Sequence, residues 1–267
     1  MRRPFTKMHG LGNDFVLFDA RAEPLPLTTQ QVRSLSDRHT GIGCDQLFVL
    51  EPSDRADVFM RIWNSDGGEV QSCGNGARCV AAWLGGAPSI DTAGGLLHAT
   101  ATAGAASVDM GVPRFDWDAV PLAYAMDSAR LPVAWGELEG PMALSIGNPH
   151  VVFFVPDTAA VPLETLGPEI ETDALFPERV NVGVAQVTDA GLTLRVWERG
   201  AGLTRACGTG AVAAAVAGIR RGLVRSPVAV TLPGGTVEVA WAQGGGATLS
   251  GPATRVFDGE IDPDDFA

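Results

Sequence analysis

Residues 205–211 read Arg-Ala-Cys-Gly-Thr-Gly-Ala, and residues 71–77 read almost the same, Gln-Ser-Cys-Gly-Asn-Gly-Ala. The two motifs are 134 residues apart. Each Cys-Gly-x-Gly opens a run of small apolar residues, which covers residues 77–84 in the first copy and 211–219 in the second. Neither run has a polar stripe, so each is predicted to form a helix that is buried on all sides.

Each motif places a cysteine at the predicted start of a helix. Glycines at this point allow a ligand to approach the free N–H groups of the first turn. The helix dipole favours anions there and lowers the pKa of a nearby thiol. The two helix starts, one with Cys73 and the other with Cys207, are therefore predicted to hold one carboxylate from both sides. The alternative is that both are buried apolar residues, as free cysteines usually are, but this does not explain why the whole motif occurs twice.

The composition indicates a folded protein with two domains of ordinary size. The chain has 267 residues, 46% of them apolar, which is enough to form real cores. A formal net charge of −12 and a pI near 4.7 argue against nucleic acid or an anionic membrane as the main partner. No segment has the pattern of a signal peptide or a membrane span. We expect a cytoplasmic protein that acts on a small molecule.

Cysteine and lysine usage limits the cofactors. The four cysteines contain no Cys-x-x-Cys pair, so neither a zinc ribbon nor a thioredoxin-type motif is expected, and reduced thiols fit best. Lys7 is the only lysine in the sequence. A pyridoxal phosphate enzyme needs a lysine for its Schiff base, so that cofactor would depend on Lys7 alone. We predict an enzyme with no cofactor and no bound metal.

The rest of the chain also repeats. Residues 147–153, Gly-Asn-Pro-His-Val-Val-Phe, correspond to residues 12–18, Gly-Asn-Asp-Phe-Val-Leu-Phe, at an offset of 135. Offsets that agree within one residue over most of each half indicate a duplicated domain. We predict one copy over residues 1–113 and a second over residues 114–267, whose last residues are candidates to return to the first domain.

The predicted fold class is α+β, with two pseudo-symmetric domains that face each other across a cleft. Each domain is expected to fold a curved, mostly antiparallel sheet around its buried central helix. A short helix with a threonine cap is predicted over residues 28–39. The proline-rich, acidic stretch 113–141 is the predicted linker. The predicted strands include residues 16–18, 47–50, 58–63, 90–92, 96–101 and 106–110.

Two thiols on opposite sides of a cleft can invert a carbon centre. A thiolate removes a proton from one face of the carbon, while a thiol returns a proton to the other face. The α-proton of an amino acid is far too weakly acidic for a thiolate unless the developing enediolate is stabilised. N–H groups and dipoles at the two helix N-termini would stabilise that charge on the substrate carboxylate.

The complete set of motifs resembles the diaminopimelate epimerase family, in the family's order and over nearly the whole chain. The motifs cover residues 7–15, 63–67, 73–78, 147–150, 179–182, 198–200 and 207–210. The resemblance implies cofactor-independent interconversion of L,L- and meso-diaminopimelate, in lysine and peptidoglycan-precursor synthesis. It also implies a homodimer whose subunits have two domains, each enclosing a central helix.

The resemblance further assigns roles to individual residues. Cys73 and Cys207 resemble the acid–base pair. The backbone cradle for the reacting carboxylate corresponds to Gly74, Asn75, Gly208 and Thr209. The substrate's ammonium and carboxylate groups would be held by Asn13, Gln46, Asn64, Asn148, Asn181, Glu198 and Arg199. His150 lies where a site histidine is expected. Arg199 offers a planar cation, which suits a carboxylate.

Three positions depart from the family's usual sequence, namely Leu203, Asp173 and Trp197. None of them has a predicted part in the reaction, so only local packing is in doubt. Cys44 and Cys79 are assigned to packing as well, although Cys44 is close to Gln46 in the sequence.

Three other functions remain open. Proline-racemase-type enzymes also use two cysteines on this architecture, but they have no need of Asn64, Asn181 and Arg199 for a second amino-acid end. A thiol redox switch, in which Cys73 and Cys207 form a reversible disulfide, leaves those same positions unexplained. The third is an amino-acid-binding protein without catalytic activity. The absence of a signal peptide argues against a periplasmic protein of this kind.

Overall fold

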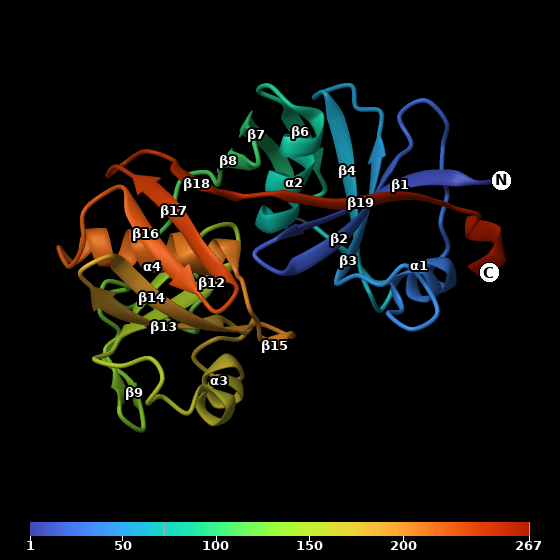
Figure 1. The fold of residues 1–267 in the computed structure, drawn as a ribbon. Helices are drawn as coiled ribbons and strands as arrows, with labels where there is room; N and C mark the ends of the chain where they lie inside the picture. Colours follow the sequence, from blue (N-terminus) through green and yellow to red (C-terminus); the bar gives the residue numbers. More distant parts are fainter. Residues whose placement is uncertain (72, 267) are drawn as a thin grey trace. The chain divides into compact units, whose positions relative to one another are not determined.

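The computed structural model describes residues 1–71 and 73–266, which form two compact units (Figure 1). The first unit consists of Met1–Val108 together with Ser250–Ala267, and the second of Asp109–Leu249. In the described part of the chain, no helix is both long and apolar enough to cross a membrane.

The first unit contains one sheet with mixed strand directions. Its strands are β1 (Arg3–Gly10), β2 (Asn13–Asp19), β3 (Gln46–Glu51), β4 (Val58–Asn64), β5 (Glu69–Val70), β6 (Ser89–Thr92), β7 (Gly95–Thr102), β8 (Ala105–Asp109) and β19 (Thr254–Ile261). β2 pairs with β3 in parallel, and β4 pairs with β6 in parallel. The pairs β1–β2, β3–β4, β6–β7 and β7–β8 are antiparallel.

The second unit repeats this order of pairings. Its strands are β11 (Met142–Ser145), β12 (Pro149–Phe154), β13 (Asn181–Thr188), β14 (Gly191–Glu198), β15 (Gly202–Leu203), β16 (Val228–Leu232), β17 (Gly235–Trp241) and β18 (Ala247–Pro252), the last of which extends into the first unit. β12 pairs with β13 in parallel, and β14 with β16 in parallel. The pairs β11–β12, β13–β14 and β16–β17 are antiparallel.

The duplication extends to the register of the strands. In the first unit Phe15 of β2 pairs with Gln46 of β3, and in the second His150 of β12 pairs with Asn181 of β13. Both partners are displaced by the offset of 135 that the sequence repeat has. The prediction of an α+β fold with two duplicated domains is therefore confirmed.

Each unit contains one central helix, α2 (Gly74–Leu84) or α4 (Gly208–Arg220). The middle of each helix is buried without interruption, from Asn75 to Ala81 in α2 and from Gly210 to Gly218 in α4. α2 packs against β1, β2, β7 and β19, and α4 packs against β11–β14, β16 and β17. The absence of a polar stripe in both runs thus corresponds to strands on several sides.

Two further helices lie outside the repeat motifs. α1 (Thr29–Ser36) begins at the predicted cap Thr28, whose hydroxyl and backbone form a reciprocal capping box with Gln31. It ends at Ser36, earlier than predicted, because Asp37 adopts an extended backbone. α3 (Leu163–Glu171) was not predicted, and Pro168 inside it hides the helical pattern.

The prediction of a linker over residues 113–141 is wrong. Val120, Leu131 and Trp135 belong to the apolar core of the second unit, and the Trp135 ring stacks on Phe176 at 6.1 Å between centroids. The stretch also forms a hairpin of β9 (Ala134–Trp135) and β10 (Leu138–Glu139). Its prolines and acidic residues separate isolated apolar side chains, so it has linker composition although those side chains are buried.

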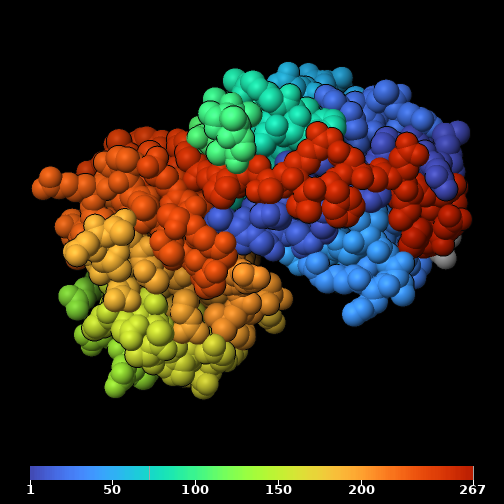
Figure 2. All heavy atoms as spheres, in the orientation of Figure 1, coloured from blue at the N-terminus to red at the C-terminus, as the bar shows by residue number. Residues whose placement is uncertain are grey.

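β19 brings the chain back to the first unit. It pairs antiparallel with β1, and Figure 2 shows these last residues, in red, lying against the blue start of the chain. A 3-10 helix, η1 (Pro263–Phe266), follows and packs against α1. In the second unit Arg114, which follows β8, bridges Ser145 of β11 in the corresponding place. The chain therefore divides after Val108 and again after Leu249, and its last residues belong to the first unit.

The first turn of α2 leaves no room for a side chain at Gly76. A Cβ atom there would lie 2.3 Å from Cζ of Phe48, a fully buried ring that stacks on Phe15. At the equivalent Gly210 of α4, the nearest atom would be Cγ2 of Val196 at 3.0 Å. The start of α2 therefore fits its sheet more closely than the start of α4.

We predict that Gly76→Ala lowers the free energy of unfolding by about 1–3 kcal/mol, because the buried Phe48 ring must move. Gly210→Ala is the matched control, since it makes the same change at the same helix position with more space. Urea unfolding of both variants measures the difference. Equal losses of stability would show that the tight contact with Phe48 does not matter.

Candidate active site

The two cysteines cap the two central helices in the same way. Cys73 and Cys207 have extended backbones and directly precede α2 and α4. The Sγ atom of Cys73 accepts a hydrogen bond from the backbone N–H of Gly76 at 3.3 Å, and Sγ of Cys207 accepts one from Gly210 at 3.4 Å. Each sulfur atom thus occupies the place that a serine or aspartate oxygen takes in an ordinary helix cap.

Burial and the charge of Glu198 keep the Cys207 thiol protonated. Cys207 is 4% exposed, and this burial raises its pKa well above the ordinary value, with the charge of Glu198 acting in the same direction. The Thr209 hydroxyl, 3.7 Å from Sγ, and the N–H of Gly210 only partly oppose this. Burial also raises the pKa of Glu198, against the hydrogen bond that its carboxylate accepts from Thr204. In this environment Cys207 is a protonated thiol.

A side-chain hydrogen bond joins the β1–β2 turn to the start of α2, and its equivalent joins the corresponding elements of the second unit. Asn75 Nδ2 donates to Asn13 Oδ1 at 3.2 Å. In the second unit Asn148 Nδ2 donates to Thr209 Oγ1 at 3.3 Å. The sequence repeat equates Asn13 with Asn148 and Asn75 with Thr209, so the duplication has kept the contact although one residue type changed.

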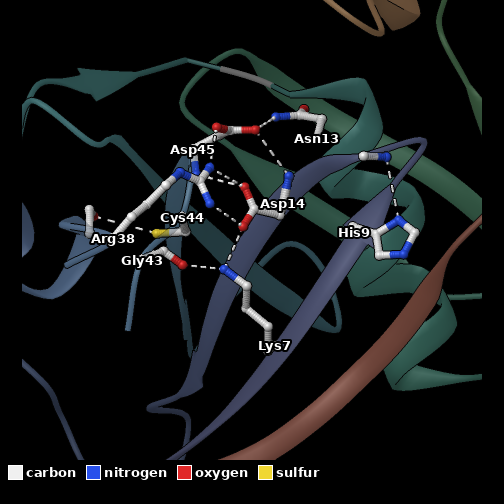
Figure 3. Close-up of polar contacts among 10 residues, drawn as sticks. Lys7, His9, Asn13, Asp14, Arg38, Gly43, Cys44 and Asp45 are labelled. Carbon is white, nitrogen blue, oxygen red and sulfur yellow. Dashed lines mark hydrogen bonds and ion pairs between the residues drawn. The ribbon is translucent and has the colours of Figure 1, made fainter. Parts of the chain in front are cut away.

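The orientation of the Asn13 amide is set by a group of charged residues beneath it (Figure 3). Asn13 Nδ2 donates to Asp45 Oδ2 at 2.9 Å, and Arg38 pairs with both Asp45 and Asp14 at 2.7 Å. Burial would raise the pKa of Asp14, but hydrogen bonds from Arg38 and Lys7 outweigh this and hold that pKa well below its usual range. Asp45 and Arg38 were not predicted; only their closeness to Gln46 in the sequence hinted at them.

Lys7, the only lysine, is part of the same group of charges. Its Nζ lies 2.6 Å from Asp14 Oδ2 and also donates to the carbonyl oxygen of Gly43, and the residue is buried (Figure 3). Its ammonium group is thus held by an ion pair and a carbonyl. Among the residues that the structure describes, no three His, Cys, Asp or Glu side chains are arranged to bind a metal.

Gln46 and Asn64 lie opposite each other on β3 and β4. Gln46 Nε2 donates to Asn64 Oδ1 at 2.9 Å, which leaves Gln46 Oε1 buried with no hydrogen-bond partner in the described part of the chain. A buried acceptor without a partner costs free energy. It is therefore suited to an N–H group of a ligand.

His150 is a neutral imidazole. It is 1% exposed, and burial, followed by the nearby charge of Arg199, lowers its pKa to about 3. Its Nε2 lies 3.0 Å from Asn148 Oδ1, so Nε2 carries the proton and donates it to this amide. His150 thus sets the orientation of Asn148, as Asp45 sets that of Asn13.

Asn181 holds the turn that carries Arg199. Asn181 Nδ2 donates to the Pro149 carbonyl at 2.8 Å, and its Oδ1 accepts the backbone N–H of Arg199 at 3.0 Å. Buried Glu171 accepts the next backbone N–H, that of Gly200, at 2.9 Å. The Arg199 side chain is exposed and donates to the Glu178 carbonyl at 3.0 Å. Its guanidinium therefore has further N–H donors for a carboxylate.

The structure groups the predicted site residues unit by unit. Asn13, Gln46, Asn64, Asn75 and Cys73 belong to the first unit, where Asn75 contacts Asn13 and Gln46 contacts Asn64. The second unit contains the predicted residues Asn148, His150, Asn181, Glu198, Arg199, Cys207, Gly208 and Thr209. Each unit thus combines one cysteine that caps a helix with a set of amide side chains.

Cys44 and Cys79 have buried, protonated thiols. Burial raises the pKa of Cys44 and raises that of Cys79 to about 12. Cys44 is part of an apolar core of the first unit. Both residues therefore have the environment of packing residues.

The sequence model of the diaminopimelate epimerase family matches residues 5–115 and 142–256. The diaminopimelate epimerase of Erythrobacter litoralis is 60% identical over 269 aligned residues, with 100% of each chain covered. A solved phenazine biosynthesis protein of the PhzF family, from Enterococcus faecalis, has a TM-score of 0.70 at 13% identity and covers 98% of this chain and 100% of its own. A probable proline racemase from Agrobacterium radiobacter has a TM-score of 0.68 at 16% identity, with 99% and 94% covered. The two structural likenesses show a shared fold.

We predict that His150 makes the folded protein less stable in acid. Its pKa is about 3 in the folded protein and near 6.5 in the unfolded chain, so the unfolded chain alone binds this proton between those values. The stabilisation is complete above pH 6.5 and falls with decreasing pH by about 1.4 kcal/mol per unit. In urea unfolding between pH 7.5 and 4.5, the free energy of unfolding of His150→Gln should therefore fall less with decreasing pH than that of the wild type.

The exposed His39 supplies the control, because it meets water in both states. His39→Gln should keep the acid dependence of the wild-type protein. If His150→Gln shows the same dependence as His39→Gln, His150 does not remain neutral in the folded protein.

Proposed function

The chain belongs to the diaminopimelate epimerase family and epimerises diaminopimelate, and we propose that Cys73 and Cys207 carry out the two proton transfers of that reaction. The observation that carries this proposal is that each unit caps its buried helix with a cysteine sulfur. Inversion of a carbon centre requires one group on each of its faces, and the duplicated units supply one thiol each.

The helix starts stabilise the charge that develops during the reaction. Removal of the α-proton places negative charge on the substrate carboxylate as an enediolate. We assign the carboxylate cradle to backbone groups of Gly74, Asn75, Gly208 and Thr209, which lie in the first turns of α2 and α4. N–H groups in a first turn have no partner within the helix, and the helix dipole favours negative charge there.

The two sulfur atoms take complementary roles in each turnover. One enters as thiolate and removes the α-proton, while the other enters as thiol and protonates the opposite face of the same carbon. The bond from carbon to hydrogen breaks on one side as a new one forms on the other, so no oxidant, reductant or metal takes part. For the opposite stereoisomer the two roles are exchanged.

The remaining site residues hold the two amino-acid ends of the substrate. The unpaired Gln46 Oε1 is suited to an ammonium group, as are the amide oxygens of the asparagines Asn13, Asn64, Asn148 and Asn181. The exposed guanidinium of Arg199 is suited to the distant carboxylate, because its planar fork can bind two oxygens at once. Glu198 and neutral His150 complete the set beside Cys207 and Asn148.

The family gives the reaction its place in lysine biosynthesis. We further propose that the product serves peptidoglycan-precursor synthesis, that the enzyme works in the cytoplasm, and that it forms a homodimer. The lack of a Cys-x-x-Cys pair in the sequence and the net charge of −12 support a cytoplasmic enzyme acting on a small molecule.

We predict that the reaction in D₂O labels the product before the substrate. When L,L-diaminopimelate reacts to low conversion, one thiolate takes the α-proton and the opposite thiol, already exchanged with solvent, delivers deuterium. Mass spectrometry of the separated isomers should find deuterium in the product, while recovered substrate stays largely unlabelled. Equal early labelling of both isomers would indicate a single base and rule out opposed thiols.

The same assay tests the two residues. Cys73→Ala and Cys207→Ala should each abolish inversion, because each direction needs one base and one acid. Cys79→Ala, which removes a buried thiol of α2 outside the proposed site, is the control and should remain active. Substantial epimerisation by either of the first two variants would contradict the assignment.

We predict that Arg199→Lys lowers kcat/KM at least tenfold, or about 1.4 kcal/mol of transition-state binding, because lysine keeps the charge but cannot bind a carboxylate with two parallel hydrogen bonds. Arg225→Lys makes the same change at an exposed position outside the proposed site and should stay within about twofold of the wild type. Near wild-type turnover by Arg199→Lys would remove this residue from the site.

A further inference from the structure

Arg78, in α2, is a fully buried cation with an incomplete set of partners. Its exposed fraction is 0%, and its Nη2 donates to Asn75 Oδ1 at 3.0 Å. Nε and Nη1 are buried and have no hydrogen-bond partner in the described part of the chain. None of the ion pairs among the described residues includes Arg78. The proposed reaction as described above makes no use of this residue.

Such an arrangement is unfavourable unless an anion is nearby. A guanidinium group keeps its charge in proteins, so burial cannot be relieved by loss of a proton. A buried charge without a partner is strongly destabilising, and apolar residues of similar volume are often no less stable than a buried ion pair. Simple packing of α2 therefore does not account for an arginine at this position.

The side chain of Arg78 runs towards the start of α2. Side chains on a helix are directed to its N-terminus, and the hydrogen bond to Asn75 confirms this direction. Cys73 caps the helix five residues before Arg78. Burial lowers the pKa of Arg78, and the sulfur atoms of Cys79 and Cys73 are the charges that oppose this effect. Cys79 stays a neutral thiol, since its own pKa is raised to about 12.

The carboxylates on the elements around α2 have other partners or are exposed. Asp14 pairs with Lys7 and Arg38, Asp19 with Arg21, and Asp258 with Arg255. The remaining ionisable side chains on β1, β2, β7 and β19 are Arg3, His9, His98 and the exposed Glu260. Cys73 is thus the group near Arg78 that can become an anion.

We propose that Arg78 is the counter-charge of the Cys73 thiolate in the free enzyme, so that Cys73 starts the reaction as the base and Cys207 as the acid. This rests on the proposed function for the reaction itself. When the bound stereoisomer has its α-proton on the face of Cys73, that proton moves to Cys73 Sγ, and the proton of Cys207 Sγ moves to the other face of the carbon. Exchange of protons with water then restores the starting state.

The comparison of the two repeats supports this assignment. The offset of 134 equates Arg78 with Val212, and it equates Asn64 with Glu198. The first unit therefore has a cation near its cysteine and a neutral amide at the end of β4. The second unit has an apolar residue on α4 and a carboxylate at the end of β14. The cation in the first unit lowers the proton affinity of Cys73, and the carboxylate in the second unit raises that of Cys207. Both differences therefore make the proton affinities of the two sulfur atoms unequal.

Alkylation of the four cysteines tests the proposal without substrate. The folded protein is treated briefly with iodoacetamide from pH 5 to 10, and peptide mapping gives the pH midpoint of labelling for each cysteine. In the wild type the midpoint of Cys73 should lie below the value of about 8.5 for a free cysteine and at least about 1 unit below that of Cys207. A Cys73 midpoint at or above that of Cys207 would overturn the proposal, even if the enzyme is an active epimerase.

Variants of Arg78 separate its charge from its packing. Arg78→Met should raise the midpoint of Cys73 by about 1 unit or more and leave that of Cys207 in place, whereas Arg78→Lys should retain most of the wild-type value. Val212→Ala, at the equivalent position of α4, is the control and should not move the Cys73 midpoint. An unchanged midpoint in folded Arg78→Met would overturn the proposal. If that variant labels at Cys79 and is therefore unfolded, the wild-type and lysine midpoints decide.

Discussion

A sulfur atom at the start of a buried helix is the interaction on which both units depend. The first N–H groups of a helix have no partner within it. In α2 and α4 the residues that follow this end are buried in the centre of each unit. The sulfur atoms of Cys73 and Cys207 each accept a hydrogen bond from one of these N–H groups. The bond holds each sulfur in a fixed place, and Phe48 leaves no room for a side chain at Gly76. The cap that completes the helix is therefore also the group to which we assign the proton transfers.

Duplication has kept this frame while the charges around it have changed. The contact from Asn75 to Asn13 recurs as the contact between Asn148 and Thr209. Behind Asn13 lies the carboxylate of Asp45 with its ion pairs, whereas behind Asn148 lies the neutral imidazole of His150. Two units with the same topology thus give two different electrostatic environments, which a pair of identical halves could not provide.

The features that repeat were predictable from the sequence, because two copies of one motif support the same structural assignment. The helix starts and the strands that follow Gly12 and Gly147 come from the repeat, and the threonine cap of α1 follows from local pattern. Burial was harder to predict. The stretch 113–141 has the composition of a linker, yet Val120 and Leu131 lie in the core of the second unit. Proline inside α3 hid a helix that tertiary packing stabilises.

Long-range partners were the least predictable part of the site. The sequence shows that Arg78 follows the first cysteine motif, but not that its guanidinium is buried without a carboxylate. Asp45 and Arg38 are distant from Asn13 in sequence and meet it only through the parallel pairing of β2 with β3. Such contacts depend on the register of several strands at once, which local patterns do not specify.

The return of β19 to β1 has a consequence for the order in which the protein can assemble as it is synthesised. β19 and β2 flank β1 in the sheet of the first unit, but β19 leaves the ribosome only after every residue of the second unit. During that time the growing chain has an unpaired edge at β1, and such edges attract other strands. The second unit has its sequence complete earlier, so during translation the half that is encoded last can close first.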